Sequence, residues 1–147
     1  MLFSDDPEAV NQFIDDHGGG WEAPGTFTAL GSKRGDKIVG GVTWSDYNGA
    51  HCTCNIALLP EYNHRWLLVA VLNYSFIQLK LRRLTFIVKS SNIASLTFVR
   101  HFGATLEATL RGADPSGDLL IFALWPENCP LWNRYYGKKE GQGPQSA

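Results

Sequence analysis

The chain lacks most of the features that would place it in a specialised class of protein. Its longest apolar run, Trp66 to Leu72, is far too short to cross a bilayer. The first ten residues, MLFSDDPEAV, contain no basic stretch followed by an apolar core, so we expect no secretory signal peptide. The three cysteines are few and odd in number, which argues against a disulfide-stapled secreted fold. We therefore expect a cytoplasmic protein that does not associate with membranes.

An excess of charge of either sign is also missing. Thirteen Lys and Arg residues stand against 14 Asp and Glu residues, and the formal net charge is −1. Proteins that bind nucleic acids without sequence preference need a positive surface that neutralises phosphates. We therefore expect no nucleic-acid partner.

The chain does contain ample material for a hydrophobic core. Hydrophobic residues make up 44% of it, and five Trp, five Tyr and eight Phe are among them. A chain of 147 residues has the usual size of one domain. We expect a single domain over residues 1–133. Residues 134–147, rich in Gly, Lys and Gln, are predicted to form a flexible tail.

The first half of the sequence predicts one helix and three strands. Pro7 follows the capping candidates Ser4, Asp5 and Asp6, and apolar residues at 10, 13 and 14 share one helical face before a glycine-rich stop at 15–20. Residues 26–30, 37–44 and 50–59 read as strands. A turn is expected at 32–36, and Asn48-Gly49 is a strong hairpin signal. The three strands should form an antiparallel meander.

The second half alternates helices with strands. Residues 63–79 predict a long helix that is apolar over much of its surface, and 83–89 predict a buried strand. A right-handed crossover should pair that strand parallel to the preceding one. A helix is expected over 92–103, a hairpin of strands over 105–111 and 118–124, and irregular chain over 126–132. The predicted class is α/β, of the α+β kind, with a mixed and mostly antiparallel central sheet flanked by helices.

Several sequence runs, in this order, resemble motifs of one enzyme family. Residues 37–42 (KIVGGV) are similar to a glycine-containing family strand, and residues 73–83 resemble a run found in small phage and prophage members. Asn92-Ile93-Ala94-Ser95, followed by HFGATLEATLR at 101–111, resembles the pattern N-x-x-S … G-F-x-x-E-G-x-x-R. That pattern marks the ribosomal-protein subgroup of the GNAT superfamily of N-acetyltransferases. The resemblance covers residues 26–132 and implies a sheet with a splayed parallel pair of strands.

The chain departs from the family where the diphosphate of acetyl-CoA should bind. The family usually has Q/R-x-x-G-x-G/A in that loop, whereas residues 61–68 read EYNHRWLL, with no glycine. Glycine lets a backbone approach phosphates closely, and the amides of a helix N-terminus bind them. Trp66 and Leu67 would crowd that approach if they pointed toward the phosphates, and His64 and Arg65 would compensate by direct contact.

The resemblance implies where acetyl-CoA and the reacting groups should lie. The cofactor arm would bond to the backbone of Ile56 and Leu58, and Ser95 would donate a proton to the leaving thiolate. The family's usual tyrosine proton donor would fall at Val99. The residues expected to bind the acetyl-CoA substrate are Ile56, Leu58, Asn63, His64, Arg65, Trp66, Asn92 and Ser95, and Ser95 and Glu107 are the catalytic candidates.

Each of these residues has a plainer explanation. Asn92 could simply cap a helix, Ser95 could be a small packing residue, and Glu107 could be a solvated strand carboxylate. His51 and Asn55 are the other candidates for a general base, and the base stays unassigned.

The cysteines do not predict a metal site. Cys52 and Cys54 share one strand face, but zinc normally needs four ligands and no second Cys/His pair lies in range. We expect them to behave as small buried hydrophobes, and we expect no metal.

Two functions from different classes follow. The first is transfer of an acetyl group from acetyl-CoA to an amine, which could be a protein N-terminus, a lysine or a small amine. The second is an inactive GNAT-fold protein that binds a protein partner through exposed tryptophans, with candidates Trp66, Trp125 and Trp132. A homodimer that uses strand 118–124 is compatible with both.

Overall fold

A computed structural model describes residues 1–18 and 27–137 of the chain. Its centre is a seven-stranded sheet in the order β1-β2-β3-β4-β5-β7-β6. All neighbours are antiparallel except β4 and β5, which are parallel. The predicted fold class is therefore confirmed. The strands are β1 (Leu2–Phe3), β2 (Thr28–Arg34), β3 (Lys37–Ser45), β4 (His51–Leu58), β5 (Arg83–Lys89), β6 (Thr105–Asp114) and β7 (Gly117–Leu124).

The helical segments connect and cover these strands. None of the described helices is long and apolar enough to cross a membrane. The segments are α1 (Pro7–Asp16), α2 (Arg65–Leu72), the π-helical η1 (Asn73–Gln78), α3 (Ile93–Phe102), the 3₁₀ turn η2 (Pro126–Asn128), α4 (Pro130–Trp132) and the π-helical η3 (Asn133–Gly137).

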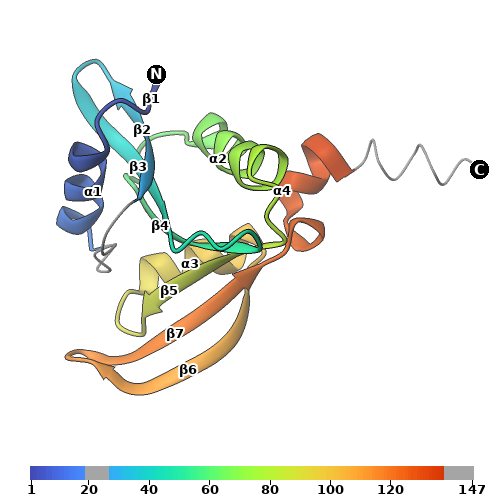
Figure 1. Cartoon of the computed structure of the whole chain (residues 1–147). Coiled ribbons are helices and arrows are strands. Elements are labelled where there is room, and N and C mark those ends of the chain that lie inside the picture. Colours follow the sequence, from blue (N-terminus) through green and yellow to red (C-terminus); the bar gives the residue numbers. More distant parts are fainter. Residues whose placement is uncertain (19–26, 138–147) are drawn as a thin grey trace, which may run out of the picture.

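Helices cover the two faces of the sheet unequally. In Figure 1, α1 lies on one side of the first four strands and α2 on the other, while the β6–β7 hairpin extends away from both. Gly41 of β3 allows α1 to approach closely, since a Cβ there would lie only 2.9 Å from Val10. The side of α2 and α3 holds the larger core, which includes Leu67, Phe86 and Phe122.

The long helix predicted over 63–79 is present but changes its form halfway. The Leu79 N–H donates to the Tyr74 carbonyl at 2.9 Å, a five-residue step that defines π geometry. Trp44 supplies a tertiary reason, because its indole Nε1 donates to the buried Ser75 hydroxyl at 3.0 Å. Sequence periodicity alone did not indicate this switch.

Three further details differ from the sequence predictions. The short edge strand β1 was not predicted, and β2 continues to Arg34 through a bulge where a turn was expected. Residues 126–132 are helical turns rather than irregular chain, and Trp132 is buried against Phe76. The helical segment η3 runs to Gly137, within the range 134–147 for which a flexible tail is predicted. Gly19, Gly20, Thr26 and residues 138–147, for which predictions were made, lie outside the described residues.

The position of β7 corrects one version of the homodimer hypothesis. This strand pairs with β5 on one side and β6 on the other, so both of its edges are occupied. It cannot pair with a second copy of itself, because a strand offers its backbone to a partner only at a sheet edge.

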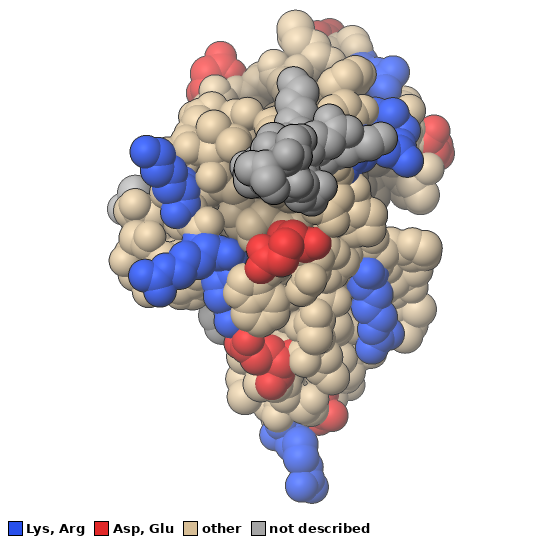
Figure 2. Space-filling model, turned by 90° about the vertical axis from the view of Figure 1, so that its right-hand side faces the viewer, with Lys and Arg blue, Asp and Glu red and all other residues tan. Residues whose placement is uncertain are grey.

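Charged side chains are scattered over the visible surface. On the face shown in Figure 2, Lys and Arg residues alternate with Asp and Glu, and uncharged residues cover most of the area between them. This distribution agrees with the formal net charge of −1.

Candidate functional site

The parallel strands β4 and β5 separate after a short paired stretch. Their register runs only from His51 opposite Arg83 to Thr53 opposite Thr85. Residues 54–58 then diverge from residues 86–89, which leaves a wedge between the two strands. The splayed parallel pair that the sequence resemblance implied is therefore present.

The backbone of β4 offers hydrogen-bonding groups to this wedge. The Leu59 N–H donates to the Val39 carbonyl at 2.9 Å, so this pair is a hydrogen-bonded one in the antiparallel ladder. Such pairs recur at every second residue, and Ala57 is the next one along β4. The N–H and C=O groups of Ile56 and Leu58 therefore point away from β3 and toward the wedge.

The start of α3 forms the opposite wall. Asn92 caps this helix through its Oδ1, which accepts the Ser95 N–H at 3.1 Å, and its Nδ2 donates to the Gly18 carbonyl at 2.9 Å. Asn92, Ser95 and Ile56 line one small cavity of about 30 Å³, roughly the space that a water molecule takes up in the liquid. The structure thus brings these three candidates together around a nearly closed wedge, and the capping role of Asn92 is observed.

The start of α2 is occupied mainly by its own side chains. Asn63 accepts the Arg65 N–H at 2.9 Å, and the half-buried His64 places Nε2 2.6 Å from the Leu59 carbonyl. Arg65 reaches in the other direction, with Nη1 donating to the Tyr135 hydroxyl at 3.3 Å. A helix leaves the N–H groups of its first turn without partners inside the helix. At the start of α2 these include the N–H groups of Trp66 and Leu67, which can donate to an external acceptor.

Neither of the bulky residues in the glycine-free loop fills the wedge. Trp66 is 67% exposed and lies near Tyr135, with ring centroids 6.2 Å apart. Leu67 is buried in the core beneath α2. The side chains of Trp66 and Leu67 therefore do not crowd the wedge.

On the α1 side of the sheet, polar side chains form a row at the point of divergence. Ser45, Thr53 and Thr85 are aligned across β3, β4 and β5, and all three are buried. The Thr85 hydroxyl lies 3.1 Å from His51 Nδ1 and accepts a hydrogen bond from Arg83 Nη2 at 3.1 Å. The Ser45 hydroxyl has no hydrogen-bond partner within the described ranges, which leaves a buried polar group available at this point.

Glu107 belongs to this second group and not to the wedge. Arg83 Nη1 donates to its Oε2 at 2.7 Å, and the hydrogen bond holds the pKa of Glu107 below its ordinary value. Glu107 and His51 line a shallow pocket of about 530 Å³ together with Trp125. The sequence candidates thus fall into two groups, one at each side of the apex where β4 and β5 part.

The cysteines are buried, as predicted. Cys52 and Cys54 lie in the core on the α2 side, and Cys129 is buried as well. Burial raises the pKa of Cys52 to about 11 and that of Cys54 well above its ordinary value, so both are thiols at neutral pH. Within residues 1–18 and 27–137 no three His, Cys, Asp or Glu side chains gather closely enough to hold a metal ion.

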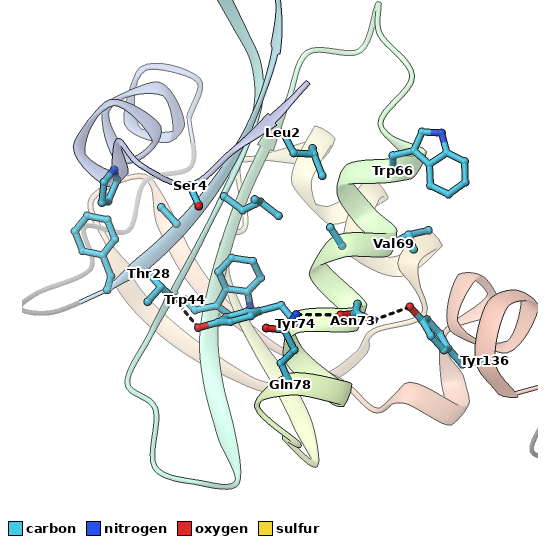
Figure 3. Close-up of a pocket in the computed structure, with 15 residues that line it drawn as sticks. Leu2, Ser4, Thr28, Trp44, Trp66, Val69, Asn73, Tyr74, Gln78 and Tyr136 are labelled. Atoms are coloured by element: carbon cyan, nitrogen blue, oxygen red, sulfur yellow. Dashed lines mark hydrogen bonds between the residues drawn. The ribbon is translucent and has the colours of Figure 1, made fainter.

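A larger cavity than the wedge lies elsewhere among the described residues and was missed by the sequence predictions. It measures about 760 Å³ and lies between β2 and the α2–η1 helix, above the ring of Trp44 (Figure 3). Asn73, Tyr74 and Gln78 of η1 line it. These residues belong to the run at 73–83 that the sequence analysis singled out, so the sequence contained a signal without indicating a cavity.

Comparisons with known proteins agree on the architecture. Neither family models nor curated proteins match the sequence. Among solved structures, mutant forms of the spermidine/spermine N-acetyltransferase SpeG from Vibrio cholerae match with a TM-score of 0.67 and 14% identity, over 92% of this chain and 98% of theirs. The Campylobacter jejuni N-acetyltransferase PseH, solved in complex with acetyl coenzyme A, matches with a TM-score of 0.53 and 18% identity, over 67% of each chain.

Two further neighbours are provisionally described as acetyltransferases. They match with TM-scores of 0.62 and 0.58 and identities of 20% and 14%, over 76% and 68% of this chain. The chain spans only 63% and 62% of their lengths. At such identities the likeness establishes the fold alone, and that fold is the one of GNAT acetyltransferases.

Proposed function

We propose that the chain is an acetyl-CoA-dependent N-acetyltransferase that transfers the acetyl group to an amine by direct attack. The observation that carries the proposal is the wedge between β4 and β5, into which the backbone of Ile56 and Leu58 points. A neighbour of the same fold, PseH, is an N-acetyltransferase solved with acetyl coenzyme A. The ordered sequence motifs of the GNAT superfamily support the same activity.

In this proposal, β4 holds the arm of acetyl-CoA as an added strand would be held. Ile56 and Leu58 supply N–H donors and C=O acceptors on the side that β5 has left. The diphosphate would meet the free amides of Trp66 and Leu67 at the start of α2, where the helix dipole favours an anion. Asn63, His64 and Arg65 flank that point, and Arg65 would exchange Tyr135 for a phosphate oxygen.

The wedge has to widen before it accepts the arm. Its cavity of about 30 Å³ holds no more than a water or two. Asn92 ties α3 to Gly18 across its mouth, so opening would break this one exposed hydrogen bond. Binding energy is then spent partly on opening, which predicts a weaker affinity than a preformed cleft would give.

The two groups of polar residues flank the reacting atoms on opposite sides. The amine nitrogen would approach the acetyl carbon from the α1 side, and a base there would take its proton. The C–S bond would break on the other side, where Ser95 would give the thiolate a proton and regain one from solvent. The acetyl carbonyl would lie between them, at the level of Thr53 and Thr85.

The base is chosen from His51 and Glu107. Glu107 is ion-paired, and its lowered pKa makes it a weak proton acceptor at neutral pH. Histidine is the side chain that most often serves as a general base, and His51 lines the same pocket as Glu107. The negative charge of Glu107, which is paired with Arg83, would then attract the positively charged acceptor amine. The acceptor class is an amine: a protein N-terminus, a lysine, or a small amine of the kind that SpeG acts on.

Isothermal titration with acetyl-CoA and with CoA tests the proposal. We expect measurable binding at about 1 mM ligand or below. Arg65→Ala should weaken it several-fold, whereas Arg111→Ala, which removes an exposed arginine on the distant β6, should not. Absence of heat at that concentration, together with no thiol release from acetyl-CoA in the presence of amines, would remove the proposal.

One observation favours a second candidate, an inactive GNAT-fold protein that works through protein contacts. The wedge is nearly closed, and Asn63 already accepts one of the amides at the start of α2. The exposed Trp66 is the kind of residue that anchors protein interfaces. An unfolding temperature that does not change with CoA, combined with stable binding of a partner that Trp66→Ala abolishes, would select this candidate.

A further inference from the structure

The geometry points to a second binding site, for a neutral small molecule with an apolar body and a hydrogen-bonding head. The site is the cavity of about 760 Å³ between β2 and the α2–η1 helix. It lies on the α2 face of the sheet, away from the polar row at Ser45, Thr53 and Thr85. The inference does not depend on acetyl transfer.

The size and lining of the cavity suit a small organic molecule. Pockets for such ligands usually measure about 300–1,000 Å³ and are mostly apolar, with a few polar groups that converge. Leu30, Val69 and Ala70 line the apolar part, and Trp66 stands at its rim. Figure 3 shows Asn73 and Gln78 of η1 below Val69 and Trp66, with Tyr136 beside Asn73, so most of the amide and hydroxyl groups lie at that end, while Ser4 and Thr28 lie on the β2 side.

The aromatic floor of the cavity is held in place by contacts of its own. Trp44 is 4% exposed and donates its indole N–H to Ser75 at 3.0 Å. Tyr74 meets its ring edge-on, with centroids 4.8 Å apart. These contacts hold the two aromatic rings independently of any ligand, so the floor does not have to form on binding.

The polar end presents an ordered set of donors and acceptors. Gln78 Nε2 donates to Asn73 Oδ1 at 3.2 Å, and Asn73 Nδ2 donates to the Tyr136 hydroxyl at 3.1 Å (Figure 3). In this chain of hydrogen bonds, the side-chain carbonyl oxygen of Gln78 can still accept a hydrogen bond, and the Tyr136 hydroxyl can still donate one. An amide or hydroxyl head would complete both.

The π geometry of η1 is a separate indication of function at this place. Single π turns inside helices occur frequently at functional sites, because they are poorer than α geometry and persist only where they are needed. Here the π segment brings Asn73, Tyr74 and Gln78 to one cavity wall, although Asn73 and Gln78 are five positions apart, a spacing that α geometry places on different faces.

The absence of charge defines the ligand class. Among the described residues that line the cavity there is no Asp, Glu, Lys, Arg or His. A charged ligand would lose its hydration without gaining a countercharge, which is costly. A neutral molecule such as an alcohol or a primary amide avoids this cost of losing the hydration of a charge.

The test compares four probes with the same eight-carbon chain and different heads. Octan-1-ol and octanamide are neutral, whereas octanoate and octylammonium are charged. We expect the neutral pair to quench or shift the tryptophan fluorescence and to bind at least about tenfold more tightly than the charged pair. Equal binding of all four, or no binding of the neutral pair, would overturn the inference.

Two variants locate the binding. Ala70→Trp places an indole in the cavity and should weaken octanamide binding by about tenfold or more, whereas Ala113→Trp, on the exposed β6 strand, should not. If Ala70→Trp does not fold, Gln78→Leu decides, since this exposed residue can lose its amide without disturbing the core. The site would be contradicted if octanamide bound the Gln78→Leu variant as tightly as the original chain. It would also be contradicted if octanamide bound the Ala113→Trp variant as weakly as the Ala70→Trp variant.

Discussion

Asn92 joins two segments of the chain through one side chain. Its Oδ1 caps α3 and its Nδ2 holds the end of α1 at Gly18. Asn92→Ala should lower the free energy of unfolding by about 1–2 kcal/mol, since a lost N-cap alone costs about 1 kcal/mol. Urea denaturation measures this. Asn92→Asp keeps the helix cap but loses the hydrogen bond to Gly18, so it should lower the free energy of unfolding by less than Asn92→Ala does. Equal reductions for the two variants would show that the cap does not contribute to stability.

The ion pair between Arg83 and Glu107 predicts a pH dependence. The pKa of Glu107 is lower in the folded state than in the unfolded state, so the pair stabilises the fold above the unfolded pKa, which is about 4.3. This contribution is lost as pH falls through the folded pKa. Because Glu107 is exposed, we expect Glu107→Gln to cost less than about 1 kcal/mol at pH 7.

Urea denaturation at pH 7 and at about pH 3 compares the stability of the original chain with that of the Glu107→Gln variant, above and below the unfolded pKa of Glu107. The difference between them should be smaller at the lower pH, and it should shrink in high salt. A difference that is the same at both pH values would show that the amide perturbs packing and not charge.

At the scale of the secondary-structure element, the α2–η1 helix connects the core to the larger cavity. Ser75 of η1 accepts the buried indole N–H of Trp44 and is itself fully buried. Ser75→Ala should reduce stability by about 1–3 kcal/mol, because a buried donor would lose its partner. Ser91→Ala, which removes an exposed hydroxyl, should change stability by less than about 0.5 kcal/mol. Similar effects of the two substitutions in urea denaturation would argue against a role for the Trp44–Ser75 bond.

This element also shows what sequence patterns can and cannot predict. Apolar periodicity predicted a helix over 63–79, because a helix must bury one face whatever its fine geometry. The π turn contains Ser75, which accepts a hydrogen bond from Trp44, 31 positions away, and no local pattern encodes such a contact. For the same reason the cavity above Trp44 was missed, although the residues that form its polar end had been singled out.

The candidate site was predicted unevenly. Ile56, Asn92 and Ser95 do lie around one cavity, because strand alternation and the N-cap signal place them from local sequence. Glu107 was named as a catalytic candidate without a predicted position relative to these three, and in the structure it pairs with Arg83 and lines another pocket. How widely the wedge opens is a property of tertiary packing, which no motif describes.

At the scale of the whole molecule, one sheet carries two cores of different size. Phe122 of β7 is fully buried in the larger core, whereas Leu110 of β6 is 43% exposed on the uncovered hairpin. Phe122→Ala should cost about 3–5 kcal/mol and Leu110→Ala less than about 1 kcal/mol. Urea denaturation of both variants checks this, and a small cost at Phe122 would mean that β7 is not central to the fold.

The order of β2 to β5 was predictable because each connection follows simple rules, whereas the place of β7 between β5 and β6 was not predicted. The Asn48-Gly49 hairpin, the right-handed crossover and the terminal hairpin leave few alternatives. The two-residue strand β1 and the short helical turns after Pro126 were not predictable, since segments of two or three residues have no periodicity. These small elements depend on contacts with β2 and with Phe76.

The most direct test of the central claim is amide hydrogen exchange along β4, with and without saturating acetyl-CoA. Slower exchange at Ile56 and Leu58, with Ala57 unchanged because its amide already faces β3, is the result that backbone pairing with the ligand predicts. Exchange at Ile56 and Leu58 that stays the same while acetyl-CoA is shown to be bound would contradict it.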